Sequence, residues 1–165
     1  MLSLTRPEIM SQPQPWATPF VLTQTQRLLQ SYRHWINAPL LENGVSTEET
    51  AAALYGAPFV VVSHGTEEDP ILNYGNRAAL DLWETDAATF STMPSRLTAE
   101  PMEREERARM LERTARDGFI DDYSGVRITS TGRRFFIPRA TVWNLIDEGG
   151  RPCGQAATFS KWEFL

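Results

Sequence analysis

The segment ILNYGNRAALDLWETD, residues 71–86, constrains the fold of this chain more than any other. A short apolar run ends at Gly75, whose backbone freedom allows an abrupt change of chain direction. Asn76 follows, and Asn is a favoured cap for the free backbone amides at the start of a helix. Three side chains at i, i+3 and i+4 then share one face: Ala79, Leu82 and Trp83. The segment therefore predicts a strand joined at once to a helix that packs closely on a sheet.

Two helices are expected before the first strand. From residue 23, apolar side chains recur at three- and four-residue steps, which predicts an amphipathic helix that ends before Pro39. These side chains are Leu28, Leu29, Tyr32, Trp35 and Ile36. In the second segment, STEETAAALYGAP, Ser46 and Glu49 have the spacing of a capping box, and Gly56 marks the helix end.

The rest of the chain predicts a β-rich core with one more helix. PFVVVSHG and ILNY predict two strands, and a helix from about residue 98 to 116 is expected to bury Ala108, Leu111 and Ala115. Three further strands are predicted in DDYSGVRITS, RRFFIPRATVWNLID and GQAATFSKW. The long strand has apolar side chains at both parities, so both faces of the sheet should be covered. We expect the internal helices on one face and the N-terminal helix or a second subunit on the other.

This order of elements, and several segments within it, resemble a known family. Two strands, helices and an antiparallel three-strand meander form the layout of PAS domains, which often place an Asn, like Asn76, after strand two. The segments NYGNRAALDLWET, GFIDDYSGVRITSTGRRFFIPRATVWNLI and LLQSYRHWINAPLL are similar to the MEKHLA domain, a PAS-related module with a stand-alone bacterial form. The resemblance implies an α+β, PAS-like fold. Its five-stranded antiparallel sheet would have the order 2-1-5-4-3, with helices on one face and N-terminal helical caps.

Composition narrows the compartment and the partners. The 21 acidic residues outnumber the 16 basic ones, whereas nucleic-acid binding needs a clustered positive face. The arginines between residues 104 and 116 alternate with glutamates, which predicts a salt-bridged, solvated helix face. Cys153 is the single cysteine, and no apolar stretch is long enough to span a bilayer. We therefore expect a cytoplasmic protein with no nucleic-acid or membrane partner.

The sequence offers little support for catalysis or a bound metal. Its two histidines, His34 and His64, belong to separate elements, and neither has a second ligand at close spacing. Ser63 and His64 are neighbours in a strand end and so point to opposite sides, which argues against a catalytic dyad. We expect His64 either in a hydrogen-bonded loop or at the edge of a pocket. The chain is not expected to be an enzyme, no metal ligands are predicted, and the cofactor is unknown.

A small-molecule pocket is the hypothesis for the space between the sheet and the core helices, although most of its apolar members are more simply explained as core. The candidate lining residues are Tyr74, Trp83, Leu111, Ile128, Arg139, Trp143, Asn144, Gln155 and Phe159. Arg139 and Asn144 interrupt a strongly apolar strand, and a buried polar group needs a partner in protein, water or ligand. If Arg139 points inward, an acidic ligand is favoured. If it points outward, it says nothing about the ligand.

These features favour a PAS-like sensory or protein-interaction module that signals through non-covalent contacts. We divide the chain into a mobile proline-rich tail (1–19), an N-terminal helical cap (20–57) and a PAS-like MEKHLA core (58–165). A homodimer is expected, because the helix face with Leu28, Tyr32 and Trp35 must be buried against the sheet or a second copy. Two alternatives stay open: a small-molecule enzyme that uses the same cavity, and a ligand-free dimerisation module.

Overall fold

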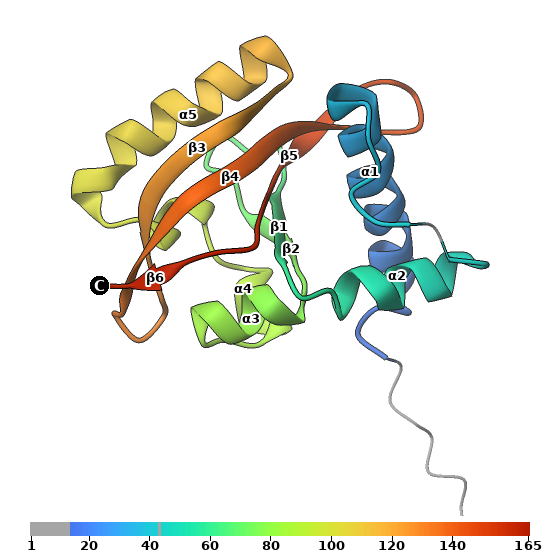
Figure 1. Ribbon diagram of the computed structural model, residues 1–165, viewed down its shortest axis with the longest axis horizontal. Helices are drawn as coiled ribbons and strands as arrows, with labels where there is room; N and C mark the ends of the chain where they lie inside the picture. Colours follow the sequence, from blue (N-terminus) through green and yellow to red (C-terminus); the bar gives the residue numbers. More distant parts are fainter. Residues whose placement is uncertain (1–13, 43) are drawn as a thin grey trace, which may run out of the picture.

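The computed structural model describes residues 14–42 and 44–165 and is built around one antiparallel sheet (Figure 1). The strand order is β2-β1-β5-β4-β3, and a short β6 pairs with β4. The strands are β1 (Val60–His64), β2 (Leu72–Gly75), β3 (Phe119–Ile128), β4 (Arg134–Ile146), β5 (Pro152–Phe159) and β6 (Glu163–Phe164). This order confirms the predicted PAS-like α+β fold. Most of the predicted tail, residues 1–13, lies outside the described residues.

Helices cover both faces of the sheet (Figure 1). They are α1 (Pro19–Ile36), α2 (Thr47–Tyr55), α3 (Arg77–Trp83), α4 (Ala87–Phe90) and α5 (Arg104–Asp117), with two 3-10 turns, η1 (Ser95–Thr98) and η2 (Pro101–Glu103). Helix α1 begins before the predicted residue 23, because Thr18 Oγ1 accepts a capping bond from the Val21 amide at 3.3 Å. The helix predicted from residue 98 is interrupted at Pro101, which favours a first turn, and α5 starts at residue 104.

Asn76 joins the helical layers on both sides of the sheet. Its Oδ1 accepts from the amide of Ala79, which caps α3 at 3.2 Å, and from the amide of Val61 in β1 at 3.0 Å. Its Nδ2 donates to the carbonyl of Leu54 at the end of α2 (3.1 Å) and to that of Phe59 (2.8 Å). The side chain is fully buried, and all four bonds are to the backbone. The predicted cap is therefore confirmed, and it also holds the end of α2 against β1.

Helix α1 covers the outer face of the sheet. The sequence predicted either this helix or a second subunit there, and the structure has the helix. The apolar face of α1 packs on β4, where Tyr32 contacts Trp143 edge-on at a ring-centroid distance of 5.1 Å. Trp35 Nε1 donates to the carbonyl of Asn144 at 2.9 Å. Gly118 leaves the space that the Trp35 ring occupies, and its φ of +91° suits glycine. The α1 face that would have needed a second copy is thus buried within the chain.

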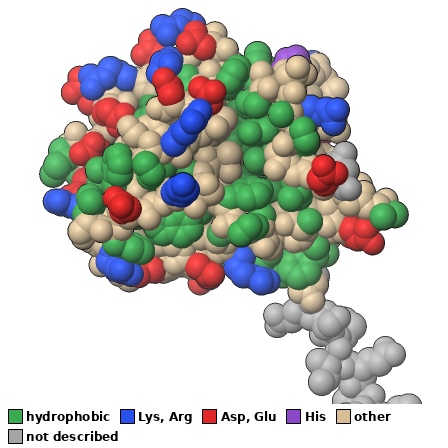
Figure 2. Space-filling view, in the orientation of Figure 1, with side chains coloured by type: hydrophobic (Ala, Val, Ile, Leu, Met, Phe, Trp, Pro, Cys, Tyr) green, Lys and Arg blue, Asp and Glu red, His purple; other side chains and the backbone are tan. Residues whose placement is uncertain are grey.

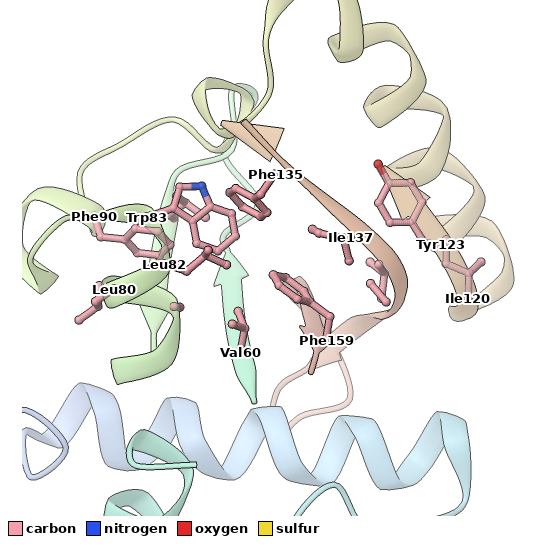
Figure 3. Packing of buried hydrophobic residues seen from close by; sticks show 14 residues of the cluster. Val60, Leu80, Leu82, Trp83, Phe90, Ile120, Tyr123, Phe135, Ile137 and Phe159 are labelled. Atoms are coloured by element: carbon pink, nitrogen blue, oxygen red, sulfur yellow. The ribbon is translucent and has the colours of Figure 1, made fainter. Parts of the chain in front are cut away.

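The inner face carries the larger apolar cluster, under α3, α4 and α5 (Figure 3). Two bulges shift the parity of the strands that form it: Ile120 pairs with Val142 and Tyr123 with Ala140, and a second shift follows before Ile137. Inward-facing residues of β4 therefore change parity along the strand. This shift, together with the cover on both faces, explains the mixed apolar pattern that the sequence shows there.

Helix α5 turns a different stripe inward from the predicted one. Ala108 and Ala115 are exposed, so the prediction is wrong for both. Arg107 and Thr114 are buried instead, and Met110 and Leu111 are half-buried beside them. The rest of α5 is a solvated face, where acidic and basic side chains lie interspersed (Figure 2). Its ion pairs include Arg109–Glu105 at 3.2 Å and Arg113–Asp122 at 3.4 Å.

Candidate functional site

The candidate site is a cavity of about 80 Å³ between the inner face of the sheet and the helices α3, α4 and α5. Its walls are mostly apolar, and their larger side chains include Leu72 of β2, Trp83 of α3, Phe90 of α4, Ile137 and Val142 of β4, and Phe159 of β5. Figure 3 shows Trp83, Phe90, Ile137 and Phe159 on the inner side of the sheet, away from α1. Such a surface suits a small apolar group, and the polar side chains among it decide what else could bind.

Arg107 is the most unusual of these polar residues. Only 8% of its surface is exposed, and it lines the cavity from α5. Its one hydrogen-bond partner in the structure is Ser95 Oγ, although a guanidinium has five N–H donors. Burial, together with the nearby charge of Arg127, lowers the pKa of Arg107 to about 10. Arg107 thus stays charged at neutral pH, and no carboxylate of the described residues forms an ion pair with it.

Arg127 enters the same cavity from β3 and is 6% exposed. Its guanidinium donates to the Val126 carbonyl at 2.8 Å and to Tyr123 Oη at 2.7 Å. Tyr123 Oη in turn donates to Glu106 at 3.1 Å, so the nearest carboxylate reaches Arg127 only through the phenol. Gly125 lies between Tyr123 and Arg127, where a Cβ atom would meet the phenol oxygen. Glycine at this position allows the two side chains to meet.

Two further residues that line the cavity, His64 and Trp83, each have a buried polar atom without a partner among the described residues. His64 is buried, and its Nδ1 lies 2.9 Å from the carbonyl oxygen of Gly65, so this nitrogen carries the ring proton of the neutral form. Its Nε2 is then a hydrogen-bond acceptor, and no described residue donates to it. Burial lowers the pKa of His64, which favours this neutral form. The indole Nε1 of Trp83 is likewise buried without an acceptor among the described residues.

Four of the predicted pocket residues line this cavity: Trp83, Leu111, Gln155 and Phe159. Gln155 is held by protein, since its Nε2 donates to the Leu111 carbonyl and to Asn144 Oδ1, both at 3.0 Å. Asn144 does not line the cavity but lies beside it, and its Nδ2 donates to the carbonyl of Thr114 at 3.1 Å. The two amides therefore fasten α5 to the sheet.

The other four candidates lie elsewhere. Tyr74 and Trp143 are buried in the outer cluster, beneath α1, and Ile128 is half-buried near the end of β3. Arg139 is exposed, and its Nε donates to the Asp121 carbonyl at 3.0 Å. Because Arg139 points outward, it carries no argument for an acidic ligand.

Arg107 and Arg127 line the cavity, whereas Arg139 does not, and neither of the two was among the predicted pocket residues. The alternating charges around Arg107 indicate a solvated face, yet this residue lies at helical spacing from the buried Thr114, seven residues on. Arg127 lies four residues after Tyr123 in the same strand, with the small Gly125 between them. Both signals were present in the sequence, but an arginine is seldom buried, and the charge pattern outweighed the periodicity.

Residues 14–42 and 44–165 contain neither a cluster of metal ligands nor a membrane-spanning helix. No three His, Cys, Asp or Glu side chains of these residues come together so that they could hold a metal ion. Within the same ranges, no helix has the length and apolar character that crossing a membrane requires.

Comparison with known proteins gives a family and a set of relatives. A family model for the MEKHLA domain matches residues 22–164. The chain is 24% identical to homeobox-leucine zipper protein ATHB-9 of Arabidopsis thaliana over 100 residues, which are 61% of this chain and 12% of that protein. It is 23% identical to homeobox-leucine zipper protein HOX10 of Oryza sativa subsp. indica over 149 residues, 89% of this chain and 18% of that protein. The chain therefore spans less than a fifth of either relative.

Solved structures with the same fold are PAS and light-oxygen-voltage domains. A PAS domain of a protein from Colwellia psychrerythraea superposes with a TM-score of 0.59 at 12% identity, covering 67% of this chain and 92% of that chain. The light-state dimer of the fungal blue-light photoreceptor Vivid gives a TM-score of 0.53 at 14% identity, covering 79% and 91%. At these identities the comparison shows the PAS fold.

Proposed function

This chain belongs to the MEKHLA domain family, and we propose that it is a PAS-like sensory module that binds a small molecule in the inner cavity. One observation carries the proposal: the residues that line this largely apolar cavity include two buried atoms without a partner among the described residues, His64 Nε2 and Trp83 Nε1. They also include a buried arginine, Arg107, that makes a single hydrogen bond to a described residue. Buried polar groups are nearly always paired, because leaving one unpaired costs about 1–3 kcal/mol. A bound molecule would supply the missing partners.

A route from the cavity to the outer face supports signalling through non-covalent contacts. Asn144 of β4 donates from its side chain to the Thr114 carbonyl of α5, and its own carbonyl accepts from Trp35 of α1. Its neighbour Trp143 packs under α1, while Val142 lines the cavity. A ligand that moves α5 or β4 would therefore change how α1 lies on the sheet. The ligand produces such a change only if it binds more tightly to one of two conformations of the chain than to the other. A partner that contacts α1 would then respond to the bound ligand.

Native mass spectrometry of the freshly purified protein, with its absorption spectrum, tests the proposal. We expect one small bound mass per chain, released on denaturation. The proposal fails if the protein carries no such mass and a chemically diverse set of small molecules leaves its Tm unchanged. That outcome would instead favour the ligand-free module and a cavity filled by solvent.

We also propose that the chain is not an enzyme, because a bound molecule that pairs with these polar groups is sufficient to explain them and no reaction is needed. The homodimer stays a prediction, and its physical basis changes because Leu28, Tyr32 and Trp35 already pack within the chain. Size-exclusion chromatography with light scattering decides between monomer and dimer. The cytoplasmic location and the absence of a nucleic-acid partner also stay predictions.

A further inference from the structure

We infer that the molecule bound in the inner cavity is a small monocarboxylate with a short hydrocarbon chain, whose carboxylate lies between Arg107 and Arg127; the inference rests on the proposed ligand-binding function. The structure places two guanidinium groups at one small cavity and leaves them short of negative charge. A ligand of this class supplies one charge and two acceptor oxygens at the same point.

The charge balance inside the cavity is the first argument. Two buried like charges repel one another, and each loses its hydration, so the pair is unfavourable without an anion. Two acidic groups of the described residues act on them from a distance: Glu106 reaches Arg127 through Tyr123, and Asp69, which is paired with Arg96, acts on Arg107 without forming an ion pair with it. Arg107 has only the neutral Ser95 Oγ. One anion that contacts both guanidinium groups would offset the repulsion and satisfy the unused donors of Arg107.

The size of the cavity is the second argument. At about 80 Å³ it is smaller than the engineered cavity of about 150 Å³ that holds benzene, and far below the range of about 300–1,000 Å³ typical of drug-sized ligands. A flavin or a haem does not fit without a large rearrangement of the core. A carboxylate with two to four carbon atoms matches the available space far better.

The character of the walls selects among small anions. Apolar side chains form most of the wall around the space, including Trp83, Phe90 and Phe159. Inorganic phosphate has no apolar part and would leave that surface unused, whereas a short hydrocarbon chain would bury against it. A guanidinium also binds a carboxylate through two parallel hydrogen bonds, which fixes its orientation. The site therefore favours a short-chain carboxylate over a mineral anion.

The first experiment compares matched ligands by thermal shift and calorimetry at constant ionic strength in a zwitterionic sulfonate buffer. The panel contains acetate, propionate and butyrate, their amides, propylamine, and inorganic phosphate. We expect at least one carboxylate to raise the Tm by about 3 °C or more at saturation, and its amide to leave the Tm unchanged. Binding of the amides as strongly as the acids would overturn the inference, as would binding of phosphate alone.

The second experiment removes each charge in turn. Arg107→Met and Arg127→Met keep much of the apolar stem and are expected to weaken carboxylate binding at least tenfold. The matched control is Arg109→Met, an exposed residue of the same helix paired with Glu105, which should change the affinity less than twofold. We also expect ligand-free Arg107→Met to have a Tm no lower than the wild type, because it loses an uncompensated buried charge. A purely structural arginine would give a lower Tm, and that result counts against the inference.

The outcomes separate this inference from the proposed function. If neutral molecules bind in the cavity and Arg107→Met binds them equally well, the carboxylate inference fails while the sensory proposal stands. If no member of the panel binds, native mass spectrometry finds no bound mass and a chemically diverse set of small molecules leaves the Tm unchanged, both fail together.

Discussion

The outer and inner faces of the sheet bury polar groups in different ways. Under α1, Gln24 Nε2 donates to Ser63 Oγ at 3.0 Å, and that hydroxyl donates to Asn73 at 2.6 Å. The outer groups left unpaired are the tips of two aromatic side chains, Tyr74 Oη and Trp143 Nε1. Under α5, two charged guanidinium groups are buried beside a void. The outer face is thus built as a neutral core, and the inner face keeps an unfavourable arrangement that a ligand could relieve.

The largest expected effect comes from breaking the outer face at its centre. Trp143 is fully buried and packs edge-on against Tyr32, so Trp143→Ala should lower the free energy of unfolding by about 4 kcal/mol. Denaturant unfolding measures the change. The matched control is Trp162→Ala, a half-buried Trp at the edge of the inner cluster, which should cost less than about 2 kcal/mol. Equal losses in the two variants would show that the outer face is not the better-packed one.

The next effect tests the residue that connects the two faces. Asn76→Ala removes a helix cap and the side-chain hydrogen bonds to the Val61 amide and to the carbonyls of Leu54 and Phe59, of which the Leu54 carbonyl keeps a bond from the Ala57 amide. We expect a loss of about 3 kcal/mol, measured by the same unfolding assay. Asp86→Ala removes only the cap of α4, where Asp86 accepts from the Thr89 amide at 2.7 Å, and should cost about 1 kcal/mol. If the two losses were alike, the additional buried bonds of Asn76 would contribute nothing.

What could be predicted from the sequence differs between the same two faces. Asn76 caps α3 as expected, and the hairpin glycines Gly132 and Gly150 adopt the positive φ angles of +88° and +78° that their turns require. These features depend on local chemistry, so neighbouring residues suffice to predict them. The outer packing of α1 follows from its apolar periodicity in the same way.

The candidate site depends instead on two non-local events. The bulges between β3 and β4 shift strand parity, so Ile137 faces the cavity while Trp143, at the same parity in the sequence, faces α1. The buried position of Arg107 depends on how α5 is rotated on the sheet, and its charge pattern indicated the opposite. The sequence left the direction of Arg139 open; the structure turns it outward and places Arg107 and Arg127 at the cavity.

A smaller effect is expected from a change at Gly125, which tests the Tyr123–Arg127 contact on the inner face. In Gly125→Ala the added Cβ would meet Tyr123 Oη, so the hydrogen bond from Arg127 to that oxygen should be lost. We expect a destabilisation of about 1–2 kcal/mol together with weaker carboxylate binding. The control is Gly149→Ala, where the nearest atom to the added Cβ is Asp147 Oδ1 at 3.4 Å, and both properties should stay near the wild type. Unchanged carboxylate binding in Gly125→Ala would mean that the Tyr123–Arg127 contact does not position the site.

The smallest effect is a dependence of stability on pH that belongs to the inner face. Burial lowers the pKa of His64 in the folded chain, so below about pH 6.5 the unfolded chain takes up a proton that the folded chain resists. The free energy of unfolding therefore keeps its full value above that pH, and it decreases as the pH falls towards the pKa of His64 in the folded chain. Denaturant unfolding between pH 7 and pH 5 should show this loss in the wild type and in His34→Gln, whose residue is exposed.

In His64→Gln the same pH range should give a shallower slope, because this variant lacks the buried imidazole. The carboxylates with lowered pKa, such as Glu84 and Asp86, add their own loss only at lower pH, since their ordinary values lie near 4. Carboxylate buffers must be left out, because a bound carboxylate would stabilise the folded chain by itself. Equal slopes in His64→Gln and the wild type would show that the His64 imidazole takes up its proton as readily in the folded chain as in water. The Nε2 atom would then be solvated. It would no longer count among the unpaired polar groups that distinguish the inner face from the outer one.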